Sequence, residues 1–234
     1  MIPVWLRNAY VGAVCYTGNR ARKIRLMEEL ARVGIHNANV TWSFPSPYRD
    51  IVLKSIPHIR MLSERPGCWG ATLTHYKILK TAYELGYSHA FIVEDDCRFL
   101  KDVHQLWNTV SLAPNGWDML LLDSFTRKGA AKNSGNGWFS CASAESTACY
   151  AVTRKAMARL IDLYESPVSG KFNNPMMRNS DHWTNTRYLG TDVKFYVAYP
   201  NLAVQCPMGD RTNCGDYVFR QYSRMHLNKN LYEM

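Results

Sequence analysis

The sequence predicts an α/β fold in which helices flank a central, mainly parallel β-sheet. The first half of the chain alternates short apolar runs with longer amphipathic runs, in the order strand, helix, strand, helix, strand, helix, strand. The run at residues 90–93 is apolar on both faces, as in a strand that is buried between two layers. The chain has 234 residues, 47% of them hydrophobic, and no segment that reads as a linker. We therefore expect residues 1–234 to form a single domain.

Four strands are expected in the first half. Each is a short apolar or alternating run bounded by glycine, proline or acidic residues. They cover residues 10–16, 39–44, 90–93 and 119–122. The segment between the second strand and the next helix, residues 46–66, is less regular and is expected to include a loop.

Three helices are expected between these strands. The first covers residues 20–33 and ends at Gly34, and the second covers residues 72–85 and ends at Gly86. The apolar face of the first helix is expected to consist of Ile24, Met27, Leu30 and Ala31. The third helix is marked by the apolar positions Val103, Leu106, Trp107 and Val110.

The second half begins with residues 127–146, which are rich in glycine, serine, alanine and asparagine. This composition predicts a long mobile loop of the kind that often borders a functional site. A strand follows at residues 147–152, and Thr153 can cap the next helix. A short helix at residues 181–189 and a strand at residues 193–199 complete the predicted elements.

The chain is strongly basic. Its formal charge is +9 and its calculated pI is about 9.2, which favours an anionic partner: nucleic acid, a membrane surface or a phosphorylated substrate. Solubility alone is the simpler explanation of this charge. The basic residues are spread along the chain, and no polybasic block indicates a nucleic-acid-binding tail. No apolar run approaches the ~20 residues of a membrane span, so a peripheral membrane association is the form of membrane contact left open.

The cysteines favour a reducing compartment. There are seven of them, and no two are spaced as in a C-x-x-C pair, so neither a zinc site nor a disulfide framework is indicated. The first ten residues, MIPVWLRNAY, lack the apolar core of a secretory signal. We therefore expect a cytoplasmic protein.

Three adjacent acids in the stretch FIVEDDCRFL form the strongest candidate site. Glu94, Asp95 and Asp96 follow an apolar strand, and ligands of open α/β sheets bind at the carboxyl ends of the strands. Adjacent carboxylates repel one another, so they need water, a cationic side chain or a metal ion. Glu94 and Asp96 are two residues apart and would point to the same side of extended backbone, which suits Mg²⁺ or Mn²⁺. A solvated turn whose Asp caps the next helix is the alternative.

The residues around this cluster resemble glycosyltransferase family 25, which includes lipopolysaccharide and collagen galactosyltransferases. The segment GCWGATLTHYKIL precedes the acids by one helix, and GWDMLLLDS, TACYAVTRKAMARLI, SDHW and FYVAYPNLAVQ follow in the family's order. The N-terminal TGNRARKIRLMEEL looks like the family's arginine-rich first turn and helix. Cys68 stands where the family usually has Glu, and Ala71 where it usually has Cys. The resemblance covers residues 10–206, and residues 207–234 form a tail outside it.

This resemblance implies a GT-A-type fold and a glycosyltransferase activity with inversion at the anomeric carbon. It implies a nucleotide-sugar donor, usually a UDP-sugar, and usually Mn²⁺, with Mg²⁺ as the other candidate. The transferred sugar would be a hexose such as galactose or glucose, and the acceptor a glycan or another hydroxyl compound. A nucleoside diphosphate would be a natural anionic partner for a chain of charge +9.

The resemblance and the strand ends also suggest which residues bind donor and metal. Asp96 matches the last acid of the family motif and is the expected metal ligand, and Glu94 would lie nearer the donor ribose or a metal-bound water. Asp95 would also belong to the donor site, or else turn inward to accept backbone N–H bonds. The other expected donor-site residues are Tyr16, Thr17 and Arg20, after the first strand, and His75, which faces the donor phosphates or bonds a buried carbonyl. His226, in the tail, is a candidate second metal ligand.

Inversion requires a base that takes the proton of the acceptor hydroxyl. Asp181 matches the family's late Asp and is the expected base, although a carboxylate there would also stabilise a helix N-terminus. Glu145 and Asp123 are the competing candidates. Trp138 and Trp183 would either stack on a sugar or belong to the core.

Two other functional classes remain open at this stage. A non-catalytic binding or scaffold protein of the same fold is favoured by the Cys68 departure. A nucleic-acid-binding protein is favoured by the pI and the aromatic content, but no basic-aromatic motif accompanies them. We therefore expect no nucleic-acid partner.

Overall fold

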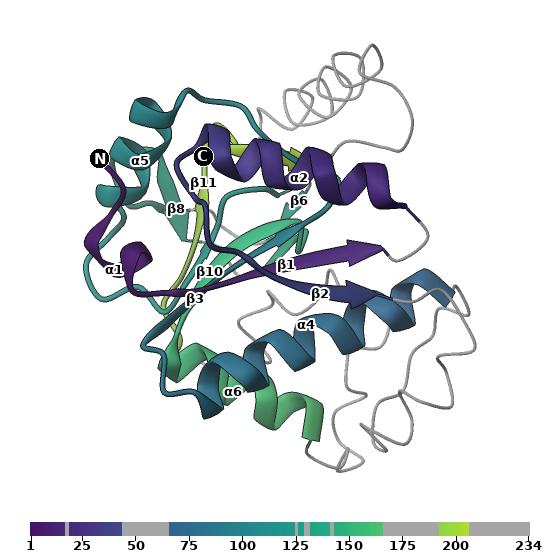
Figure 1. Cartoon of the computed structure of the whole chain (residues 1–234). Helices are drawn as coiled ribbons and strands as arrows, with labels where there is room; N and C mark the ends of the chain where they lie inside the picture. The colour runs from purple at the N-terminus through teal and green to yellow at the C-terminus, as the bar shows by residue number, and fades with distance from the viewer. Residues whose placement is uncertain are drawn as a thin grey trace.

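The computed structural model describes residues 1–16, 19–43, 66–124, 126–128, 132–140, 143–165 and 192–205, with only the backbone of residues 43, 66–69, 126–128, 143 and 145 (Figure 1). The expected helix at residues 181–189 lies outside these residues. Thr17, Asp181 and His226 also lie outside them. Their proposed roles therefore remain predictions.

An eight-stranded sheet forms the centre of the described part of the chain, in the order β2-β1-β3-β10-β5-β11-β8-β7. Its strands are β1 (Tyr10–Tyr16), β2 (Asn39–Ser43), β3 (His89–Glu94), β5 (Met119–Leu121), β7 (Lys132–Asn133), β8 (Trp138–Ser140), β10 (Cys149–Thr153) and β11 (Phe195–Ala198). Six of these eight described strands run in one direction, and β8 and β10 run against them. The predicted α/β class with a central, mainly parallel sheet is confirmed.

Helices cover both faces of this sheet. They are α1 (Val4–Arg7), α2 (Arg20–Arg32), α4 (Pro66–Glu84), α5 (Val103–Ser111) and α6 (Arg154–Glu165). In Figure 1, α4 and α6 lie against one face, and α2 and α5 lie against the other. The side chains of each strand point alternately to these two faces. Val14 and Ile92 belong to the core under α4 and α6, whereas Val11 and Phe91 belong to the core under α2 and α5.

Gly12 allows α4 to pack closely on β1. A Cβ atom at this position would lie 2.4 Å from Cγ2 of Ile78, which α4 carries. Any larger residue would force the Ile78 side chain or α4 itself to shift. This contact therefore sets the distance between the sheet and the helix that carries His75.

Several predicted helix ends are found where the sequence places them. Gly34 and Gly86 follow α2 and α4 with φ of +84° and +82°, a conformation that favours glycine. At the other end of α2, the side chain of Asn19 accepts a hydrogen bond from the backbone N–H of Arg22. Thr153 caps α6 as predicted, because its hydroxyl oxygen accepts from the N–H of Ala156.

Two helix predictions need correction. The buried residues of α2 are Leu26 and Leu30, while Ile24 is 50% exposed, so the apolar face is rotated from the predicted one. The position of β1 under the helix decides this rotation, and the sequence pattern alone fits either stripe. Helix α4 begins at Pro66, six residues before the predicted start, because proline is well suited to a first helical turn and the glycines after it do not interrupt the helix.

The predicted loop at residues 127–146 is also wrong. This segment forms β7 and β8 of the central sheet and contributes to a two-stranded sheet made of β6 (Thr126–Lys128) and β9 (Ser143–Glu145). Its glycines build tight turns, since Gly135 and Gly137 have φ of +85° and +80° between β7 and β8. Trp138 is fully buried and donates its Nε1–H to the carbonyl of Thr109, so it belongs to the core.

A second small sheet continues from the acidic cluster. Strand β4 (Cys97–Phe99) pairs antiparallel with β12 (Ala203–Gln205). The pairing places Gln205 opposite Cys97, one residue beyond Asp96. A residue from the far end of the described chain is thereby brought to the acids.

Cys15, Cys97 and Cys149 are buried free thiols. None of the helices in the described ranges combines the length and apolar character that crossing a bilayer requires.

Candidate functional site

The candidate site lies where the order of the parallel strands reverses. From β1 the chain passes through α2 to β2 on one side of β1, and then through α4 to β3 on the other side. Open α/β sheets bind ligands at the carboxyl ends of the strands that flank such a point. Here β1 ends at Tyr16 and β3 ends at Glu94, with Asp95 and Asp96 in the turn that follows.

Asp95 joins the two strand ends. Its Oδ2 accepts a 2.7 Å hydrogen bond from the backbone N–H of Tyr16, and its own N–H donates to the carbonyl of Val14. Its Oδ1 lies 2.7 Å from Nη2 of Arg22. Burial, together with the charge of Glu94, raises the pKa of Asp95, and the contacts with Tyr16 and Arg22 oppose this rise. The geometry matches the inward-turned role that the sequence offered for this residue.

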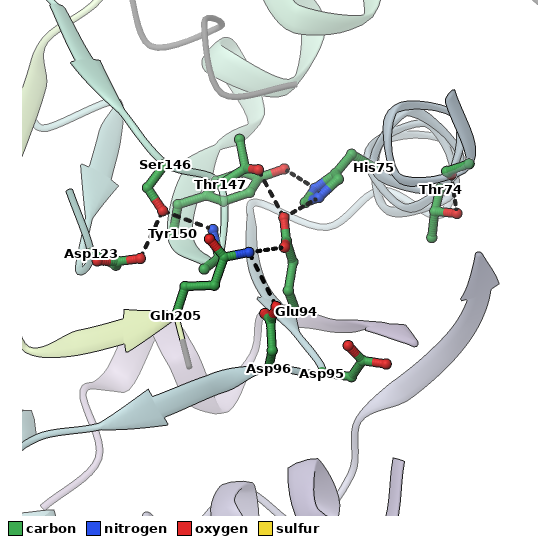
Figure 2. Close-up of polar contacts among 12 residues, drawn as sticks. Thr74, His75, Glu94, Asp95, Asp96, Asp123, Ser146, Thr147, Tyr150 and Gln205 are labelled. Atoms are coloured by element: carbon green, nitrogen blue, oxygen red, sulfur yellow. Dashed lines mark hydrogen bonds and ion pairs between the residues drawn. The ribbon is translucent and has the colours of Figure 1, made fainter. Parts of the chain in front are cut away.

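Glu94 is held by a chain of polar side chains from α4 and β10 (Figure 2). Its Oε1 lies 3.0 Å from Nε2 of His75 and accepts a 2.8 Å hydrogen bond from the hydroxyl of Thr147. Nδ1 of His75 lies 3.0 Å from the hydroxyl of Tyr150. A carboxylate only accepts hydrogen bonds, so Nε2 carries the proton and, in the neutral imidazole, Nδ1 accepts from Tyr150.

The pKa of Glu94 is lowered by this environment. Burial is the largest influence and pushes the pKa upward, but the hydrogen bonds from His75 and Thr147 and the charge of Arg22 outweigh it. Glu94 is therefore an anion at neutral pH. Its second oxygen, Oε2, lies 3.4 Å from Nε2 of Gln205.

Asp96 differs from its neighbours in having an unsatisfied oxygen. Its Oδ2 accepts from Nε2 of Gln205 at 3.2 Å and lies 2.9 Å from Nη2 of Arg22. Its Oδ1 is buried and has no hydrogen-bond partner among the described residues. Burial, followed by the charge of Glu94, raises the pKa of Asp96 to about 8. A buried carboxyl oxygen of this kind calls for a cation or an ordered water. With its pKa raised to about 8, the group retains a proton at neutral pH, and a bound cation would displace that proton.

These residues fit a divalent cation that arrives with a phosphorylated ligand. Among the described residues, no three His, Cys, Asp or Glu side chains come together as a metal-binding group. Mg²⁺ in nucleotide-dependent enzymes is commonly held by one or two carboxylates together with substrate phosphates, so a full protein cage is not required. Oδ1 of Asp96, which has no hydrogen-bond partner within the described ranges, could supply one such carboxylate ligand.

The other predicted donor-site residues within the described ranges differ in their burial. Tyr16 is half-buried at the end of β1, and Arg20 is exposed in the first turn of α2. His75 is fully buried and bonded to Glu94 and Tyr150, so it lies behind the acids. This place makes it a support for Glu94.

Four residues of the site were not predicted from the sequence: Arg22, Thr147, Tyr150 and Gln205. Gln205 lay within a quoted motif, and a lone amide at the end of an apolar run was a usable signal. Thr147 and Tyr150 are polar residues in a strand that is otherwise apolar, which often indicates a buried hydrogen bond. No sequence signal distinguished Arg22 from Arg20 and Arg25 on the same helix.

Asp123, a competing candidate for the base, forms a buried cluster beside this site. It is fully buried, its Oδ2 accepts a 2.7 Å hydrogen bond from Ser146, and its Oδ1 accepts from Nδ2 of Asn201. Ser146 has a φ of +149°, an unfavourable value for a residue with a side chain, and directly precedes Thr147. Asp123 thus holds the turn that presents Thr147 to Glu94.

Comparison with known proteins finds similarity to solved structures alone. No protein-family model matches the chain, and no curated protein matches it in sequence. The chain is similar to a glycosyltransferase involved in the glycosylation of the major capsid of PBCV-1, with 11% identity, coverage of 90% of this chain and 98% of that chain, and a TM-score of 0.44.

Two further solved structures show a comparable likeness. One is 4-diphosphocytidyl-2C-methyl-D-erythritol synthase from Anaerococcus prevotii, with 10% identity, coverage of 92% and 99%, and a TM-score of 0.42. The other is the mannosyltransferase PcManGT from Pyrobaculum calidifontis in complex with GDP-Man and Mn²⁺, with 12% identity, coverage of 96% and 64%, and a TM-score of 0.41. At identities and scores this low, no donor, metal or acceptor is transferred to this chain.

Proposed function

We propose that this chain is a metal-dependent glycosyltransferase of the GT-A type that uses a nucleotide-sugar donor. The observation that carries the proposal is the buried Oδ1 of Asp96, which lacks a hydrogen-bond partner among the described residues and lies just after β3, beside the end of β1. This is the position at which an open α/β sheet binds its ligand, and the atom is one that a hard cation would satisfy. The resemblance of the surrounding sequence to glycosyltransferase family 25 supports the same assignment.

The donor would lie across the ends of β1 and β3. Asp96 would hold Mn²⁺ or Mg²⁺, and His226 is the proposed second ligand from the tail. Glu94 and the residues after β1, Tyr16, Thr17 and Arg20, would contact the nucleotide. A divalent ion at this place would neutralise the charge that develops on the departing nucleoside diphosphate.

His75 supports the donor site indirectly in this proposal. Its Nε2–H holds Glu94 in one orientation and its Nδ1 is fixed by Tyr150, so the ring keeps the carboxylate ionised and in place. Gln205 spans Glu94 and Asp96 and sets their separation (Figure 2). These two residues are positioning residues.

Asp181 is the proposed base, and transfer would proceed with inversion. The base takes the proton of the acceptor hydroxyl as that oxygen attacks the anomeric carbon and the diphosphate leaves with the bonding electron pair. The buried position of Asp123, with both oxygens hydrogen-bonded, favours Asp181 over that competitor. The proposed donor is a UDP-hexose with galactose or glucose, and the proposed acceptor is a glycan or another hydroxyl compound.

Calorimetry with UDP tests the proposal. UDP should bind more tightly with Mn²⁺ than with EDTA, because a cation held by Asp96 would also attract the diphosphate. The Asp96→Asn variant should lose this difference. Release of free sugar from a panel of nucleotide sugars would then identify the donor. Equal UDP affinity in both buffers would refute a bridging metal, and binding of oligonucleotides without nucleotides would place the chain in a different class.

A further inference from the structure

The positively charged side chain of Arg22 lies against the acidic cluster formed by Glu94, Asp95 and Asp96. One nitrogen, Nη2, lies 2.7 Å from Oδ1 of Asp95 and 2.9 Å from Oδ2 of Asp96. The side chain is 12% exposed, so solvent screens these contacts weakly. Its backbone is fixed by the cap of α2, where Asn19 accepts from the N–H of Arg22.

This arrangement opposes the binding of a metal ion on its own. A cation that reached Oδ1 of Asp96 would lie on the same carboxylate that the Arg22 guanidinium already contacts through Oδ2. Like charges at such a distance repel, and the repulsion is stronger where water is scarce.

A diphosphate would remove this obstacle. Guanidinium groups bind phosphate oxygens through paired, charge-assisted hydrogen bonds. Both carboxylate contacts are made by a single nitrogen, so one rotation of the side chain releases Asp95 and Asp96 together. The N-terminal turn of α2, which carries Arg22, follows β1, and the positive end of the helix dipole favours an anion on this side.

We propose that Arg22 is an internal counter-ion that closes the acidic cluster to divalent cations in the free protein and moves to the diphosphate of the donor when the donor binds. Metal binding then depends on the nucleotide, and the two ligands bind as a coupled pair. This inference rests on the metal and donor site of the proposed function and adds a residue that controls the order of binding. Binding energies are reciprocal, so the donor must favour the metal by the same factor as the metal favours the donor.

Electron paramagnetic resonance with Mn²⁺ as the probe tests this proposal without any activity measurement. With Mn²⁺ alone, the wild-type chain should bind weakly, and Arg22→Gln should bind roughly tenfold more tightly, within the usual range of coupling between ligands. Arg22→Lys keeps the charge and should stay weak. Arg7→Gln, the same change at an exposed residue of α1, before the other end of β1, is the matched control and should equal the wild type.

A second titration in the presence of UDP completes the cycle. UDP should strengthen Mn²⁺ binding to the wild type by a larger factor than in Arg22→Gln, because the variant has no counter-ion to displace. Circular dichroism confirms that each variant is folded. The wild-type comparison of Mn²⁺ with and without UDP needs no variant, and equal affinity in the two conditions would overturn the inference.

The outcomes separate this inference from the proposed function. If UDP strengthens Mn²⁺ binding but Arg22→Gln binds Mn²⁺ alone no better than the wild type, the metal site stands and the role of Arg22 is wrong. If neither the wild type nor Arg22→Gln binds Mn²⁺ with UDP, GDP or CDP, both proposals are wrong. Tighter Mn²⁺ binding by Arg22→Lys would show that the shape of the side chain, and not its charge, excludes the metal, and would also overturn the inference.

Discussion

The backbone N–H of Tyr16 donates a 2.7 Å hydrogen bond to the carboxylate of Asp95, across the ends of β1 and β3. The two residues are 79 positions apart in the chain. The bond fixes the spacing of the strand ends between which the proposed donor binds. The middle acid of the cluster therefore has a structural task that differs from those of its neighbours.

Removing this clamp should destabilise the protein. Asp95→Ala leaves the N–H of Tyr16 without its acceptor, a loss of about 1–3 kcal/mol in the free energy of unfolding. Asp95→Asn keeps a carbonyl acceptor and should lose less. Urea denaturation of both variants measures the difference, with Asp162→Ala on the exposed face of α6 as a control expected to change stability by under ~0.5 kcal/mol. Equal stability of Asp95→Ala and the wild type would show that the strand ends do not depend on this bond.

The hydrogen bond between Tyr150 and His75 should matter for both stability and nucleotide binding. Tyr150→Phe removes the hydroxyl that holds Nδ1 of His75, at a cost of about 1–3 kcal/mol. His75 would then hold Glu94 less firmly, and UDP affinity should fall while the Mn²⁺ dependence persists. Thermal melting and calorimetry measure the two effects. Loss of stability with unchanged UDP affinity would restrict His75 to a structural role.

The strands and helices that the sequence predicted best are those whose pattern is fully local. Strand β1 has the predicted bounds, because seven residues of near-continuous apolar character end directly before the sequence Thr17-Gly18. Helix α5 buries Leu106, Trp107 and Val110, as the helical spacing of these apolar residues predicted. Elements of this kind carry their own boundaries and need no information from the rest of the chain.

The site depended on contacts that no local pattern contains. Gln205 reaches Asp96 over 109 positions because β12 pairs with β4, and that pairing is a tertiary event. The sequence offered several arginines near the first strand, and the register of α2 on the sheet selects Arg22. The acids themselves were predictable because they end a strong strand, whereas their partners come from distant elements.

The base assignment can be tested directly by Asp181→Asn. The substitution is nearly isosteric and removes the proton acceptor, so turnover should fall by ~10²–10⁴-fold. Binding of UDP and Mn²⁺ should be unchanged, since the base contacts the acceptor and not the donor. Donor turnover with a suitable acceptor and calorimetry with UDP provide the two readouts. Wild-type turnover in this variant would transfer the role to Glu145 or Asp123.

Asp96 should make the protein without metal less stable as the pH rises. Its pKa lies at about 8 in the folded chain, above the ordinary 3.8, so between these values the folded protein holds a proton that the unfolded chain has lost. The free energy of unfolding therefore falls as the pH rises through this window. Asp96→Asn has no such proton, and its melting temperature in EDTA should exceed that of the wild type by a margin that grows from about pH 4 to about pH 8. Asp162→Asn, on the surface, should show no such trend.

The Asp96→Asn variant also distinguishes the two roles considered for Asp96, that of a metal ligand and that of a helix cap. An Asn carbonyl can still contact a cation, but it has no charge with which to hold one, so Asp96→Asn should lose metal-dependent activity while remaining folded. In the structure the residue that caps α5 is Asp102, whose carboxylate accepts from the N–H groups of His104 and Gln105. A fall in the melting temperature of Asp96→Asn in EDTA would contradict the prediction that the Asp96 side chain destabilises the protein without metal. Among the three acids, Asp96 alone has an oxygen without a hydrogen-bond partner in the described part of the chain, so it is the acid expected to hold the metal. Full activity of Asp96→Asn with Mn²⁺ would therefore refute the metal site, whatever the melting curve shows.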